Sequence, residues 1–276
     1  MKTRIISGTL GICFLTLILY LYNTIVLNFV VSLVCALMVY EIFFATKMLK
    51  KSFLMFLISV LYSVVIPFLN TRQFSSYFLL LTMVYVILNV LLLLKQSKKI
   101  RLYDMFFCCV FSICVTLFTS NVIYIRQRFF PYGLYYVILF FIIPWVCDAG
   151  AYFMGLRFGK KKLAPEISPK KTVEGAIGGA IFSFLSVLIY NIIFLNVINF
   201  KIRIDFVILF VVTILGIVFA IVGDLSMSVF KRQNNIKDFG NIIKGHGGIL
   251  DRFDSWLFVS AILYPFVKHF PILYFN

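Results

Sequence analysis

The sequence predicts an all-α polytopic membrane protein with about nine transmembrane helices and a cytoplasmic N-terminus. The first observation is composition, since 62% of the 276 residues are hydrophobic, 13% are charged, and the mean hydropathy is +1.04. This composition excludes an ordinary soluble domain. The second is that apolar stretches of about 17 to 25 residues, long enough to cross a bilayer, recur along the chain. The third is an alternation of basic residues between successive loops, which predicts the orientation.

Nine apolar stretches are separated by short polar segments, and each is expected to form one helix. A charged segment precedes the first stretch, as in a signal peptide, but no small-residue cleavage site follows it, so we expect it to be retained. In chain order the stretches cover roughly residues 5–22, 25–46, 53–70, 74–94, 104–124, 131–155, 175–197, 204–230 and 249–270.

The basic residues divide unequally between the two sides that this arrangement creates. The N-terminus and four alternate loops carry 20 of the 26 lysines and arginines, and the other side carries 6. Because basic loops stay in the cytoplasm, the N-terminus is predicted inside and the C-terminus outside, in the plasma (inner) membrane. The formal charge of +16 then reflects this bias and attraction to anionic membrane lipids, and nothing indicates nucleic acid as a partner.

The chain is predicted to divide into N-terminal transmembrane helices (1–130) and a C-terminal catalytic region (131–276). Two cytoplasmic loops of the second region, 156–174 and 231–250, mix acidic residues, basic residues and glycines. Positive-inside bias alone explains Lys160 to Lys162 in the first loop. It does not explain the other polar residues, so the functional site is expected between the two loops.

The first loop and the helix before it supply a carboxylate and a phosphate-binding segment. Asp148 lies within the sixth apolar stretch, where an ionised carboxylate is costly without a partner. A satisfied core hydrogen bond is the structural alternative. The segment "SPKKT" combines hydroxyl groups with ammonium groups, which suit phosphate oxygens. Its candidate residues are Ser168, Lys170, Lys171 and Thr172.

The second loop continues a polar stripe that begins inside the eighth apolar stretch. Helical spacing places four residues of this stripe on one face. They are Asp224, Ser228, Lys231 and Arg232. The glycines that follow allow backbone amides to turn toward an anion, and Asp251, Arg252 and Asp254 open the ninth stretch. Oxygen ligands from aspartates suit Mg²⁺, which shares its coordination shell with phosphates.

These residues resemble the signature of the phosphatidate cytidylyltransferase (CDP-diacylglycerol synthase) family. Residues 144–179 are similar to a second block of that family, in which a Trp-x-x-Asp segment leads to "SPKKT" and a glycine-rich helix. The chain departs from the pattern at Lys244, where the family usually has Pro or Gly. The signature is carried by Ser228, Phe230, Lys231, Arg232, Lys237, Asp238, Gly240, His246, Gly247, Gly248, Asp251, Arg252 and Asp254.

The resemblance implies that CTP and phosphatidate react to give CDP-diacylglycerol and pyrophosphate in phospholipid biosynthesis. Together with the spacing, it predicts Mg²⁺ bound by Asp224 and Asp251, with Asp148 as a third ligand. The triphosphate is assigned to Lys231, Arg232, Lys237 and Arg252. The phosphatidate head group is assigned to Ser168, Lys170, Lys171 and Thr172, although these two sets are exchangeable. Further substrate-binding residues are Ser228, Asp238, His246, Gly247, Gly248 and Asp254, the last by holding Arg252 or Lys231.

Two alternative functions and the oligomeric state stay open. A CTP-dependent polyprenol or phytol kinase, or a related lipid cytidylyltransferase, would use the same nucleotide site with another acceptor. A transporter would also place ionisable residues within its spans. The polar residues here gather at one side of the membrane and no inverted repeat is visible, which disfavours a transporter. A homodimer is left open.

Overall fold

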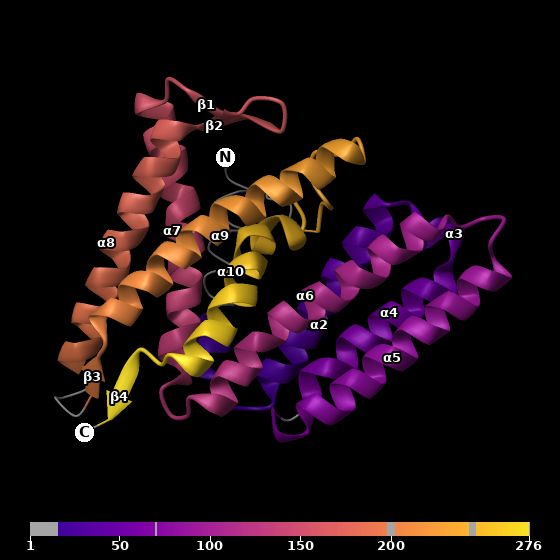
Figure 1. Ribbon diagram of the computed structural model, residues 1–276, viewed down its shortest axis with the longest axis horizontal. Helices are drawn as coiled ribbons and strands as arrows, with labels where there is room; N and C mark the ends of the chain where they lie inside the picture. Colours follow the sequence, from indigo (N-terminus) through magenta and orange to yellow (C-terminus); the bar gives the residue numbers. More distant parts are fainter. Residues whose placement is uncertain (1–15, 70, 198–201, 243–246, 276) are drawn as a thin grey trace. The chain divides into compact units, whose positions relative to one another are not determined.

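Eight long helices lie at the positions of the second to ninth apolar stretches in the computed structural model, which describes residues 16–69, 71–197, 202–242 and 247–275. These helices confirm the predicted placement of helical segments (Figure 1). Most of the first predicted stretch, 5–22, lies outside the described residues. The helices are α2 (Val26–Ala45), α4 (Phe53–Val65), α5 (Thr71–Lys95), α6 (Leu102–Arg128), α7 (Gly133–Phe158), α8 (Val173–Val197), α9 (Phe206–Gln233) and α10 (Leu250–His269).

Six helices in the described part of the chain are long and apolar enough to cross a membrane. They are α2, α6, α7, α8, α9 and the segment Tyr77–Lys95 of α5. Helix α4, even with the short 3-10 turn η1 (Ile66–Phe68) that extends it, is shorter than the others. Helix α10 carries Asp251, Arg252, Asp254 and Lys268 among its 20 residues, which lowers its hydropathy. The protein is therefore helical with several apolar spans, and the count of nine stays a prediction.

The chain forms two compact units, whose boundaries lie within α7, at the end of α9 and within α10. The first comprises Met1–Leu134 and Asn234–Phe253. In it α2 packs on α4 and α6, and α4 packs on α5, while the one-turn helix α3 (Met48–Lys51) precedes α4. Polar side chains join the apolar helices, since Asn28 Nδ2 donates to the carbonyl of Pro67 at 2.6 Å. The predicted division at residue 130 stays a prediction.

The second unit comprises Tyr135–Gln233 and Asp254–Asn276. Helices α7 and α8 approach closely in it, because a Cβ at Gly179 would collide with the carbonyl oxygen of Cys147. Small residues allow such backbone approach between helices in membranes. Ser183 Oγ then donates to the carbonyl of Ile143 at 3.0 Å and joins the same two helices. These contacts hold α7 and α8 against each other.

Two small antiparallel sheets interrupt the helices of the second unit, and the sequence did not predict them. Strand β1 (Lys162–Ala164) pairs with β2 (Ser168–Thr172), and β3 (Ile202–Ile204) pairs with β4 (Leu273–Phe275). Figure 1 shows them at opposite ends of α8. Pro169 disfavours a helical conformation at Ser168, which is consistent with the extended backbone there. The first of the two predicted polar loops, 156–174, thus contains a defined hairpin.

Candidate active site

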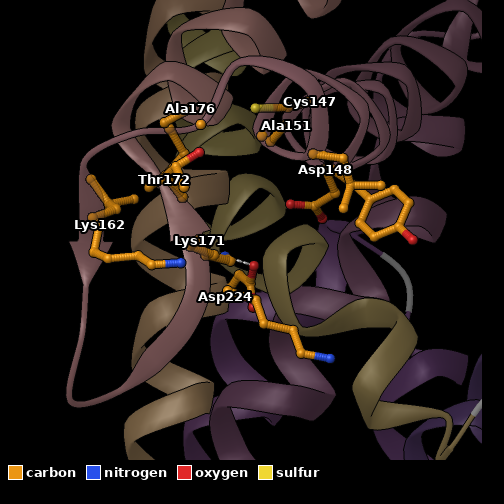
Figure 2. A pocket seen from close by; sticks show the side chains of 15 residues that line it. Cys147, Asp148, Ala151, Lys162, Lys171, Thr172, Ala176 and Asp224 are labelled. Atoms are coloured by element: carbon orange, nitrogen blue, oxygen red, sulfur yellow. Dashed lines mark ion pairs between the residues drawn. The ribbon is translucent and has the colours of Figure 1, made fainter.

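The second unit contains a cavity of about 550 Å³ between α7, the β1–β2 hairpin, α8 and α9. Figure 2 shows polar side chains from α7, the hairpin and α9 pointing into it. Its size is within the range of small-molecule sites. The residues that line it are Cys147, Asp148, Ala151, Tyr152, Gly155, Leu156, Gly159, Lys162, Leu163, Lys170, Lys171, Thr172, Ala176, Ile221 and Asp224.

Helix α7 contributes one face to this cavity, on which helical spacing brings Asp148, Ala151 and Tyr152 together. Asp148 is partly buried and accepts a hydrogen bond from Ser255 Oγ at 2.7 Å. The carboxylate therefore has the partner that its position in an apolar helix requires. It also lines the cavity, so Asp148 reaches the site while it keeps this hydrogen bond.

The hairpin presents Lys170, Lys171 and Thr172 to the cavity. Thr172 Oγ1 accepts from the amide of Gly175 at 3.1 Å and caps the N-terminus of α8. Glu174 closes the base of the hairpin, since its Oε2 accepts from the amides of Lys160 at 2.9 Å and Lys161 at 3.1 Å. The Thr172 cap and the Glu174 carboxylate join the hairpin to the start of α8, which restricts the positions of Lys170 and Lys171.

Lys171 is one of three lysines that line the cavity. It forms an ion pair with Asp224 of α9, drawn as a dashed line in Figure 2. Burial lowers the pKa of Lys171, and the negative charges of Asp148 and Asp254 oppose that shift. One ammonium group is thus surrounded by carboxylates from three helices, α7, α9 and α10. Such a site can rearrange its charges when a highly charged anion binds.

Other predicted residues of this unit lie beside the cavity without lining it. Lys231 Nζ of α9 lies 3.7 Å from Asp254 Oδ2 of α10, and only 13% and 10% of the two side chains are exposed. Arg232 Nε donates to the carbonyl of Ile167 in the hairpin at 3.3 Å. Ser228 is buried on α9, and Ser168 is not among the lining residues. The predicted phosphatidate-binding set is therefore gathered in the cavity except for Ser168.

Residues 234–250, which contain four glycines and are called the glycine-rich loop below, belong to the first unit. Asp251 Oδ2 accepts from the amides of Phe239 at 2.8 Å and Gly248 at 3.0 Å, which ties the two ends of the loop together. Gly247 has a φ of +84°, a conformation that favours glycine. Lys237, Asp238 and Arg252 are exposed in this unit. His246 and Lys244 lie outside the described residues.

Sequence reasoning missed two residues. Lys162, which we attributed to positive-inside bias, lines the cavity, and Figure 2 shows its ammonium end turned toward Lys171 and Asp224. Glu41 of α2 is fully buried and accepts from the amides of Ile249 at 2.8 Å and Leu250 at 2.7 Å. A lone carboxylate within an apolar stretch is the signal that could have identified Glu41.

The fit of a metal ion rests on the carboxylates of the cavity. In the described ranges no three His, Cys, Asp or Glu side chains converge closely enough to hold a metal ion by themselves. Mg²⁺ usually takes one or two protein carboxylates and completes its shell with water and substrate phosphates. Asp148 and Asp224, which point into the same cavity (Figure 2), fit that donor set.

Comparison with known proteins finds one family and several relatives. A model of the cytidylyltransferase family matches residues 2–270. A phosphatidate cytidylyltransferase of Bacillus subtilis (strain 168) is 45% identical over 133 residues, 48% of this chain and 47% of the relative. One of Staphylococcus haemolyticus is 48% identical over 131 residues, 48% of each chain. One of Staphylococcus saprophyticus is 38% identical over 194 residues, 70% of this chain and 69% of the relative. The matched part thus spans about half the length of the first two relatives.

Proposed function

Since this chain belongs to the cytidylyltransferase family, we propose that it transfers a cytidylyl group from CTP to phosphatidate, giving CDP-diacylglycerol and pyrophosphate. The names of its relatives support this substrate pair. The observation that carries the proposal is the cavity at one end of apolar helices, where three lysines and two aspartates line about 550 Å³. Such a site suits phosphate groups that arrive both from the aqueous phase and from a lipid.

The reaction requires a phosphate oxygen of phosphatidate to attack the α-phosphorus of CTP. A new P–O bond forms there, and the bond to the bridging oxygen breaks as pyrophosphate leaves. Both reactants are anions, so the protein must neutralise charge and align them. Lys170, Lys171 and the hydroxyl of Thr172 serve the phosphatidate head group in this proposal. The attacking oxygen is already deprotonated at neutral pH, and no general base is needed.

We assign Mg²⁺ to Asp224 and Asp251, with Asp148 as a third ligand. When bound, Mg²⁺ supplies positive charge to the phosphate oxygens in the transition state. Asp224 and Asp148 line one cavity, which supports their part of the assignment. In this proposal Lys171 supplies positive charge beside Asp224, and Mg²⁺ would add to that charge when bound.

The triphosphate is assigned to the basic residues of α9, the glycine-rich loop and the start of α10. Asp254 holds Lys231 in place, as its distance of 3.7 Å supports. We keep nine spans, a cytoplasmic N-terminus and a cytoplasmic active site in the inner membrane as part of the proposal; the homodimer stays a prediction. The nucleotide-binding residues are Ser228, Lys231, Arg232, Lys237, Asp238, His246, Gly247, Gly248 and Arg252.

The test of the reaction is product analysis with purified protein in detergent. With CTP, Mg²⁺ and phosphatidate, we expect pyrophosphate and CDP-diacylglycerol in equal amounts. A polyprenol or phytol kinase would release CDP and phosphorylate its lipid alcohol, which would overturn the proposal. For the topology, a cysteine replacing Lys161 in a variant without native cysteines should react with an impermeant thiol reagent only after lysis. Reaction in intact cells would contradict a cytoplasmic hairpin.

A further inference from the structure

Glu41 is a buried carboxylate far from the residues of the signature in sequence. It lies near the C-terminal end of α2, and none of its surface is exposed. A carboxylate in such surroundings is strongly destabilising unless hydrogen bonds compensate it. The apolar neighbours of Glu41 in α2 give no reason for a charge at this position, so its partners must supply the reason.

The partners of Glu41 are backbone amides 208 and 209 residues away. Oε1 accepts from the amide of Ile249 at 2.8 Å, and Oε2 accepts from the amide of Leu250 at 2.7 Å. Leu250 is the first residue of α10, so both donors belong to the amides that a helix leaves unsatisfied at its start. A negative charge there also interacts favourably with the helix dipole. Two bonds to two oxygens fix the orientation of the helix start relative to α2.

Glu41 also accounts for two glycines of the loop. A Cβ at Gly248 would lie 2.5 Å from Glu41 Oε1, and a Cβ at Gly240 would lie 2.8 Å from the same atom. Any larger residue at either position must displace the carboxylate. Gly240 and Gly248 therefore leave room for the side chain of Glu41.

The same loop is held from its other side by Asp251. The amide of Gly248 donates to Asp251 Oδ2 at 3.0 Å, while Glu41 accepts from the next two amides in the chain. Three consecutive backbone amides, from residues 248 to 250, thus bind two carboxylates. This arrangement fixes the backbone that carries the glycine-rich segment and the first turn of α10.

We propose that Glu41 is a positioning residue for CTP, acting through the glycine-rich loop and without touching the reacting atoms. This inference rests on the proposed assignment of that loop to the nucleotide. Loss of Glu41 should let the loop and the start of α10 shift, so that the amides and the nearby basic residues bind the triphosphate less well. Phosphatidate is assigned to the hairpin of the second unit, and its binding should change little.

The first experiment compares Glu41→Ala with Asn28→Ala on the same helix. Asn28 is also buried and donates a hydrogen bond between segments, but it contacts Pro67 and not the loop. We expect Glu41→Ala to raise the KM for CTP about tenfold, with the KM for phosphatidate changed less than twofold. Asn28→Ala should lower thermal stability and leave both KM values unchanged. Glu41→Gln retains one acceptor oxygen and should lie between wild type and Glu41→Ala.

The second experiment tests the contact directly with a double-mutant cycle. Gly248→Ala alone should raise the Kd for CTP, because the new Cβ collides with Glu41. In the Glu41→Ala background the same substitution should have a much smaller effect, since the carboxylate is absent. CTP binding is measured by calorimetry, so this test works even if the proposed lipid product does not form. Equal effects of Gly248→Ala in both backgrounds, or equal KM changes for both substrates in Glu41→Ala, would overturn the proposal.

Discussion

The cavity of the second unit and the glycine-rich loop of the first unit both depend on carboxylates, but these carboxylates bind different groups. In the cavity Asp224 pairs with the ammonium group of Lys171, and Asp148 accepts from a hydroxyl. In the loop Glu41 and Asp251 accept from backbone amides. A side-chain ion pair can be exchanged for a substrate or a metal while the fold persists. A carboxylate bound to the backbone shapes the fold itself.

This difference predicts different kinetic effects in the two regions. Substitution of a cavity carboxylate should lower kcat, because it removes charge that acts on the reacting phosphates. Substitution of Glu41, the loop carboxylate with no proposed metal role, should mainly raise the KM for CTP. The following predictions test this contrast, beginning with the largest expected effect.

Asp224→Asn should lower kcat at least about a hundredfold, a loss of several kcal/mol in transition-state stabilisation. The substitution removes the partner of Lys171 and a proposed Mg²⁺ ligand while preserving side-chain size. The measurement is a Mg²⁺ titration of CDP-diacylglycerol formation. A matched control is Asp104→Asn, which breaks the 2.5 Å pair with Lys51 in the first unit and should leave kcat near wild type. A wild-type rate and Mg²⁺ midpoint for Asp224→Asn would exclude it as a ligand.

Asp251 accepts hydrogen bonds from the loop and is also a proposed Mg²⁺ ligand, and Asp251→Asn separates these two roles. An asparagine oxygen can still accept from the amides of Phe239 and Gly248, so the loop should keep its shape while the charge is lost. If Asp251 binds Mg²⁺ as proposed, kcat falls about a hundredfold and the Mg²⁺ midpoint rises. Asp251→Ala should in addition raise the KM for CTP. Wild-type kcat in Asp251→Asn combined with a raised KM in Asp251→Ala would leave Asp251 with the loop role alone.

Asp254→Asn should raise the KM for CTP several-fold and change the Mg²⁺ midpoint little. Asp254 lies 3.7 Å from Lys231, and the nearly buried position of both side chains reduces screening by water. Loss of the charge should allow Lys231 to move away from the triphosphate. The comparison with Asp251→Asn is made under identical conditions, and a shifted Mg²⁺ midpoint for Asp254→Asn alone would reverse the two assignments.

The lowered pKa of Lys171 leads us to expect a loss of activity at alkaline pH. Burial lowers its pKa below the ordinary lysine value of about 10.4, so raising the pH removes this cation earlier than that of an exposed lysine. We expect kcat/KM for phosphatidate to fall as the pH rises through this pKa. Lys171→Arg keeps a charge at every accessible pH and should move the fall to higher pH, with a reduction of a few-fold at neutral pH. An unchanged alkaline limb in Lys171→Arg would assign it to another group.

Gly179→Ala should have the smallest effect on kinetics, because it acts on helix packing. Its Cβ would collide with the backbone oxygen of Cys147, and such overpacking typically costs about 1–3 kcal/mol. Gly178→Ala tests the same packing at the neighbouring position, since its Cβ would collide with Cβ and Cγ of Met154. Thermal inactivation in detergent should be faster for both variants than for the wild type, while both keep near-normal KM values. Wild-type stability of both variants would indicate that α7 can shift away from α8.

Local patterns in the sequence were sufficient for the helices and for many of the candidate residues. Hydropathy depends on consecutive residues, and helical spacing places Asp224 and Ser228 on one face, so the helices and this polar stripe could be predicted without knowledge of any partner. The pairing of Lys231 with Asp254 was also anticipated as one of two options. The metal-binding and substrate-binding roles of the candidate residues stay proposals, because contacts within the protein do not reveal what a residue binds.

The tertiary structure decided what each polar residue contacts. It turned the first loop into a hairpin that places Lys171 beside Asp224, and it brought Lys162 to the same cavity. It also joined Glu41 to amides 208 and 209 residues later. By itself the sequence determined an apolar helical protein with a phosphate-binding signature, because both properties are written in neighbouring residues. Contacts across such separations have no local pattern, and they arise only when packing brings distant segments within hydrogen-bonding distance.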